Sequence, residues 1–151
     1  MNEVVGGLRQ MYNLERFAVE VYRRQIRAFP QKDIRERLEA ARDNEQEHVD
    51  DLRARIEELG GSCPWQGFFF QMAGMVLGST STLLGRMFAL NADIRLEQRA
   101  VRDYGAFLQK IDFDENSRRL IQKNIEDEKV HIKRWEDSKK ILKGEGVKSA
   151  I

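Results

Sequence analysis

The sequence predicts an all-α fold, a single antiparallel four-helix bundle built from two helical hairpins. Apolar residues recur at steps of three and four in four long stretches, which is the spacing of one face of a helix. Only two prolines, Pro30 and Pro64, interrupt a chain of 151 residues, so long helices are permitted. No stretch alternates apolar and polar residues over more than a few positions, as a half-buried strand would.

Composition excludes several classes of function. Hydrophobic residues make up 41% of the chain and charged residues 34%, a balance typical of a globular domain. Lys and Arg total 26 against 25 Asp and Glu, so no bulk positive charge indicates nucleic-acid binding. A lone cysteine, Cys63, excludes a disulfide framework and a zinc ribbon. The amino terminus lacks a secretory pattern, and we expect a cytoplasmic protein.

The first hairpin is predicted from two stretches. Leu8, Tyr12, Val19 and Tyr22 share one face of a helix over 3–29, which Pro30 ends. The second helix covers 32–59 and stops at a glycine pair, Gly60 and Gly61, a signal typical of a helix carboxyl end.

An uncharged stretch follows the first hairpin. Residues 64–85 carry no charge, and we expect 64–78 to connect the hairpins. The length would suffice for a membrane span, but four glycines and several polar residues argue against one. A buried interface wall and a surface that dips into a membrane remain the two alternatives.

The second hairpin comprises helices over 79–111 and 114–142. The third stripe of apolar residues starts at Leu83 and ends at Ile111. The chain then breaks, and Asp112 with Glu115 has the spacing of a capping box. Residues 144–151 are expected to form a flexible tail.

Each predicted core stripe contains a carboxylate near its middle, where an apolar residue is expected. The only two histidines of the chain each follow one of these glutamates by three residues. Positions i and i+3 share a helix face, so each such pair can reach one ligand side by side. The six residues are Glu15, Glu45, His48, Glu97, Glu128 and His131.

An internal repeat places these residues at one level. Glu15 lies 30 residues before Glu45 and Glu97 lies 31 before Glu128, with each predicted turn near the midpoint. A chain that rises about 1.5 Å per residue and then returns brings each pair to the same height. We therefore expect all six side chains to meet in the middle of the bundle.

Charge then predicts a metal centre. Four buried carboxylates without cations would each cost several kcal/mol of desolvation, and two divalent ions would neutralise them. Mixed carboxylate and imidazole donors suit iron, with manganese as the alternative metal. The alternative interpretation, surface salt bridges and core histidines, requires six coincidences. Glu20, Glu47 and Glu126 point away from the ligand positions and are expected to face solvent.

The same residues resemble the ferritin-like di-iron superfamily, and most closely the demethoxyubiquinone hydroxylases of ubiquinone biosynthesis. Glu15-x6-Tyr22-x2-Gln25 is similar to the first-helix motif of that family, and the two Glu-x-x-His pairs match the second and fourth. Trp65 with Gly67-Phe68, then Leu83-Leu84-Gly85 before Glu97, follows the family layout. The resemblance covers roughly residues 11 to 137. It implies a ferritin-like fold in which Glu45 and Glu128 bridge two iron ions.

The function implied by this resemblance is a monooxygenase that hydroxylates a quinone-like or other apolar ring. Its partners would be dioxygen or peroxide, a lipid-soluble substrate and an external electron donor. We expect a homo-oligomer, a dimer, with peripheral membrane contact as an open alternative. Tyr22 and Tyr104 lie two turns from their glutamates, and we expect core packing from them, with a role around the ligands as the alternative.

Two other functions stay open from the sequence. A rubrerythrin-like oxidase or peroxidase would consume peroxide without an organic product. Iron binding or storage would need a hollow shell of many subunits.

Overall fold

The computed structural model describes the backbone of residues 2–63 and 67–148, and the side chains of 3–63 and 72–144. Within these residues five α-helices are present, with a short 3-10 segment, η1 (Ile26–Ala28), after the first. The helices are α1 (Asn2–Gln25), α2 (Lys32–Glu58), α3 (Gly67–Leu83), α4 (Arg86–Lys110) and α5 (Glu115–Lys148).

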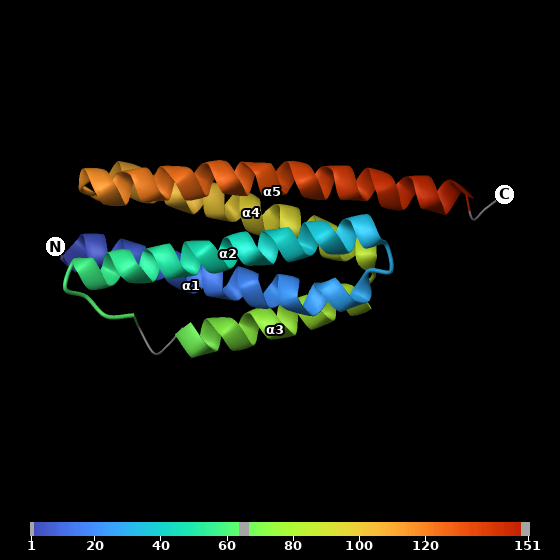
Figure 1. Cartoon of the computed structure of the whole chain (residues 1–151), viewed down its shortest axis with the longest axis horizontal. Helices are drawn as coiled ribbons and strands as arrows, with labels where there is room; N and C mark the ends of the chain where they lie inside the picture. Colours follow the sequence, from blue (N-terminus) through green and yellow to red (C-terminus); the bar gives the residue numbers. More distant parts are fainter. Residues whose placement is uncertain (1, 64–66, 149–151) are drawn as a thin grey trace.

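Two antiparallel hairpins form the bundle, as the sequence predicts. α1 packs on α2 and α4 packs on α5, while α1 also contacts α4 and α2 contacts α5 (Figure 1). The first hairpin turns at Phe29 and Pro30, where proline removes a backbone donor. The carboxyl end of α2 is closed by Gly60, which has φ of 72°. Gly61 N then donates a hydrogen bond of 2.9 Å to Ile56 O.

The apolar core has two parts, one on either side of the middle of the bundle. One contains Leu8, Met11, Leu52, Ile56 and Ile121, and the other contains Tyr22, Phe29, Leu38, Leu90 and Trp135. Because these clusters flank a polar layer, that layer is closed off from both ends of the bundle.

The prediction of one helix over 79–111 is wrong at its start. Residues 67–83 form a separate helix, α3, which runs along the outer side of α1 (Figure 1). The break falls at Leu84 and Gly85, where Gly85 has φ of 109°, a conformation that glycine adopts without strain. Leu83, expected in the core, is 85% exposed.

The position of α3 also corrects the expectation for Glu20. This side chain is buried, 3% exposed, instead of facing solvent, and Arg23 Nη1 donates to Glu20 Oε1 at 2.6 Å. A Cβ at Gly74 of α3 would lie 3.1 Å from Glu20 Cβ, so α3 covers this face of α1. Glu47 and Glu126 are exposed, as expected.

The start of α5 differs from the expected capping box. Asp114, and not Asp112, is the capping residue, because Ser117 N donates to Asp114 Oδ1 at 3.0 Å. At the other end α5 continues to Lys148, so 144–148, expected in the tail, are helical. Trp65 of the sequence motif and residues 149–151 lie outside the described residues.

Among the helices within 2–63 and 67–148, none combines the length and the hydropathy that crossing a membrane requires.

Candidate metal centre

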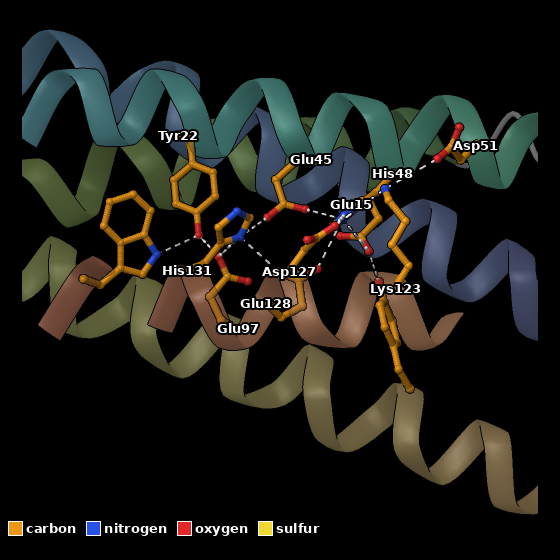
Figure 2. A network of polar contacts seen from close by, with 12 residues as sticks. Glu15, Tyr22, Glu45, His48, Asp51, Glu97, Lys123, Asp127, Glu128 and His131 are labelled. Atoms are coloured by element: carbon orange, nitrogen blue, oxygen red, sulfur yellow. Dashed lines mark hydrogen bonds and ion pairs between the residues drawn. The ribbon is translucent and has the colours of Figure 1, made fainter. Parts of the chain in front are cut away.

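The six predicted ligand residues meet in the middle of the bundle. Glu15 comes from α1, Glu45 and His48 from α2, Glu97 from α4, and Glu128 and His131 from α5 (Figure 2). Each is at most 2% exposed. The helical spacing and the matched turn positions therefore bring all six to one level, as the repeat predicts.

The side chains form two groups with the spacing of metal ligands. In each group one ligand atom per residue lies within 4.8 Å of the others. The first group is Glu15, Glu45, His48 and Glu128, and the second is Glu45, Glu97, Glu128 and His131. The glutamates of the two Glu-x-x-His pairs, Glu45 and Glu128, belong to both groups.

His48 faces carboxylates from three helices. Its Nδ1 lies 3.3 Å from Glu45 Oε2, 3.3 Å from Glu128 Oε1 and 3.7 Å from Glu15 Oε1. Three carboxylate oxygens and this nitrogen therefore lie close together, as the ligand atoms of one metal ion do.

His131 repeats this arrangement on the other side. Its Nδ1 lies 3.0 Å from Glu45 Oε1, 3.1 Å from Glu128 Oε2 and 3.5 Å from Glu97 Oε1. The two halves of the chain therefore build two similar half-sites that share two carboxylates.

The four carboxylates of this layer need a counter-charge, which protons or metal ions can supply. Burial raises the pKa of Glu15 and Glu97 well above the usual value, and the neighbouring glutamates raise both further. Burial alone would lower the pKa of His48 and of His131, but the adjacent carboxylates of Glu128 and Glu45 raise each to about 12. Without metal the layer is neutral only when it holds protons on Glu15 and Glu97 as well as on the two imidazoles, and two divalent ions would replace those protons.

Unpartnered donor atoms show that the residues fit a pair of metal ions. Both carboxylate oxygens of Glu45, Glu128 Oε1 and His48 Nδ1 are buried and form no hydrogen bond with any described residue. Such atoms are costly to bury unless something binds them. A set of four carboxylates and two imidazoles suits iron. The two clusters fit a di-iron site.

Two tyrosines cross between the hairpins to contact the ligand layer. Tyr22 of α1 donates its hydroxyl hydrogen to Glu97 Oε1 of α4, and Tyr104 of α4 donates to Glu15 Oε1 of α1. Both tyrosines are fully buried. Trp135 Nε1 in turn donates to the Tyr22 hydroxyl at 3.3 Å. The two tyrosines pack in the core, as expected, and also contact glutamates of the site.

No pattern in the sequence predicts the residue that contacts His48 Nε2. Asp127 Oδ2 lies 3.0 Å from His48 Nε2, and Lys123 Nζ lies 3.6 Å from the same oxygen. His131 Nε2 has no such partner among the described residues. Asp127 and His48 lie on different helices, 79 residues apart, so no spacing rule relates them.

A second polar layer joins Gln25 of the first-helix motif to Asp93, four residues before Glu97 on α4, and these contacts were not predicted from the sequence. Gln25 Nε2 donates to Asp93 Oδ1 at 2.8 Å and to Ser81 Oγ at 3.1 Å. All three side chains are fully buried, and burial raises the pKa of Asp93 to about 8. This layer connects α1, α3 and α4.

One comparison with known proteins identifies a family. Residues 12–141 match the family model described as "Ubiquinone biosynthesis protein COQ7". The matched range contains all six residues of the two clusters. Neither the curated proteins nor the solved structures gave a match.

Proposed function

This chain belongs to the ubiquinone biosynthesis protein COQ7 family, and on that premise we propose that it hydroxylates a quinone-like ring with a pair of iron ions. The family is that of the demethoxyubiquinone hydroxylases, ferritin-like di-iron carboxylate enzymes, for which dioxygen and a quinone are the implied substrates. The single observation that carries the proposal is the pair of buried clusters sharing Glu45 and Glu128.

The proposed ligand sets follow the two clusters. Glu15, Glu45 and His48 would hold one ion, and Glu97, Glu128 and His131 the other. Membership of Glu45 and Glu128 in both clusters supports a bridging role for these two carboxylates. Iron is the proposed metal, with manganese as the alternative from the same donor set.

When bound, the iron ions would supply the activation of dioxygen, with electrons from an external donor. The protein's own residues prepare the site for this chemistry. Asp127 Oδ2 accepts a hydrogen bond from His48 Nε2, which would leave Nδ1 to bind an ion among the carboxylates. Tyr22 and Tyr104 orient Glu97 and Glu15, and the flanking apolar clusters exclude water.

Family membership favours hydroxylation over the two other functions left open by the sequence. Peroxide reduction without an organic product and iron storage are therefore not proposed. A lipid-soluble quinone and an external electron donor remain part of the proposal, whereas a homodimer and membrane contact stay predictions from the sequence.

The test combines metal content with turnover. We expect protein purified without oxygen from iron-replete cells to hold two iron ions and to hydroxylate a short-chain quinone analogue only with reductant and dioxygen. His48→Ala or His131→Ala removes one nitrogen donor, so bound iron should fall toward one equivalent or none while the helix content, measured by circular dichroism, is kept.

Glu47→Gln is the matched control, because this carboxylate lies next to a ligand pair but is exposed. It should keep both iron and turnover. Unchanged iron in the histidine variants would contradict the ligand assignment. Failure of several quinone analogues with fully loaded protein, together with rapid peroxide consumption, would contradict the substrate class.

A further inference from the structure

The residue three positions after each ligand glutamate differs between the two sides of the site. On α2 and α5 this position holds His48 and His131, whereas on α1 and α4 it holds Ala18 and Ala100. Since positions i and i+3 share a helix face, all four side chains are directed toward the same layer. Imidazoles therefore fill the α2/α5 side, and single methyl groups leave room on the α1/α4 side.

A small cleft occupies this room. It lies between α1 and α4 and is lined by both ligand carboxylates that are not part of a Glu-x-x-His pair, Glu15 and Glu97. The rest of its lining is Leu14, Ala18, Leu96 and Ala100, with the exposed Arg99. The internal repeat of the sequence extends to this cleft, because α1 and α4 each contribute a Leu-Glu-x-x-Ala segment.

The size and polarity of the cleft select what can pass. Its volume is about 10 Å³, close to the least that holds one water-sized molecule. Apart from Glu15, Glu97 and Arg99 the walls are apolar, so a hydrated ion would lose most of its water on entering. A neutral diatomic molecule meets both conditions, and an aromatic ring is too large.

We propose that the α1/α4 cleft is the entrance by which dioxygen reaches the site, and that Ala18 and Ala100 set its width. This inference rests on the proposed function, because it assumes that the six-residue centre binds iron and uses dioxygen. Ala18 and Ala100 are 3% and 7% exposed, so a larger side chain at either position would project into the cleft.

Nitric oxide serves as the probe, since it is a neutral diatomic molecule that binds ferrous iron. Its association rate constant is measured by stopped-flow absorbance on protein loaded anaerobically with ferrous iron to equal content. We expect Ala18→Leu and Ala100→Leu to slow association by at least about tenfold and to slow dissociation by the same factor, because a narrower path hinders both directions and leaves the equilibrium affinity unchanged. Ala40→Leu, on the exposed face of α2, is the matched control and should bind nitric oxide at the original rate.

Widening variants keep the test decisive where a leucine prevents folding or iron loading. Leu14→Ala and Leu96→Ala remove the largest apolar walls and should speed association severalfold. The proposal would be overturned if the association rate stayed unchanged in the iron-loaded leucine variants of Ala18 and Ala100, or in the two widening variants. If the cleft variants change the nitric oxide association rate but no quinone is hydroxylated, the proposed function is disproved and the proposed dioxygen entrance is still supported.

Discussion

At the scale of single residues, the two buried tyrosines are the closest link between packing and the site. Each hydroxyl contacts a ligand glutamate on the helix opposite its own, Tyr22 with Glu97 and Tyr104 with Glu15. Loss of a hydroxyl would leave a buried carboxylate oxygen without its donor and free to rotate. Residues in this position typically change metal affinity when they are replaced.

We predict that Tyr22→Phe and Tyr104→Phe each weaken metal binding by roughly 10- to 100-fold while the helix content is kept. Competition with a chelator of known affinity measures the change. Tyr12→Phe is the control, because the hydroxyl of this buried tyrosine accepts a hydrogen bond from Arg53 Nη2, 3.5 Å away, instead of donating one to a ligand glutamate. Equal losses in all three variants would indicate a general loss of packing instead.

The six cluster residues could be predicted from the sequence because each relation among them is periodic. The i to i+3 pairs and the matched turn distances follow from helix geometry alone. Asp127 beside His48 and Asp93 beside Gln25 could not be predicted, because these contacts join different helices. Which side chains meet between helices depends on helix rotation, and spacing along one helix leaves that open.

At the scale of elements, α3 shows why the sequence prediction failed in one region. Among the residues of α3 whose side chains are described, the buried ones are small, Gly74, Gly78 and Ser81, so no apolar stripe marks this face as part of a helix. A Cβ at Gly74 would lie 2.4 Å from Phe17 O, and one at Gly78 would lie 2.7 Å from Val21 O. The two backbones approach this closely only because both positions are glycine.

We predict that Gly74→Ala and Gly78→Ala destabilise the protein by about 1–3 kcal/mol, because the added methyl group overlaps a backbone oxygen that cannot move alone. Chemical denaturation measures the free energy of unfolding. Hydrogen exchange should also increase in α3, since the variant helix is displaced from α1.

The control for these substitutions is Gly105→Ala in α4, where a Cβ would meet nothing within 4 Å. Removing an unconstrained glycine from a helix should stabilise the protein by about 0.5–1 kcal/mol. A stabilising effect at Gly74 as well would show that α3 does not pack against α1 as described.

At the scale of the whole molecule, buried acids make the stability depend on pH and on metal. Burial raises the pKa of Asp93 from 3.8 to about 8, and raises the pKa of Glu15 and Glu97. A group whose pKa is higher in the folded state binds more protons there, so stability falls as pH rises from its unfolded pKa to its folded pKa. The pKa values of His48 and His131 are raised to about 12, so these two residues also make stability fall as the pH rises above 6.5. The lowered pKa of Glu45 has the opposite sign, but it acts only below pH 4.5.

We predict that the metal-free protein loses stability steadily between pH 5 and pH 8. The stabilisation by added metal should increase over the same range, because cations compete with protons for the same atoms. Thermal unfolding with and without Mn²⁺, which avoids iron oxidation, measures both. At a metal concentration of 100 times Kd, the gain should reach about 2.7 kcal/mol.

Asp93→Asn separates the two sources of this pH dependence. Its amide can still accept from Gln25 and can donate to Gln25 Oε1, which has no partner among the described residues. The variant should therefore be more stable than the original chain at pH 8 and show a smaller pH slope, while the pH-dependent gain from Mn²⁺ is unchanged. A metal-free protein that becomes more stable as pH rises through this window would mean that these carboxyl groups are not buried together, and no cation would then be needed between them.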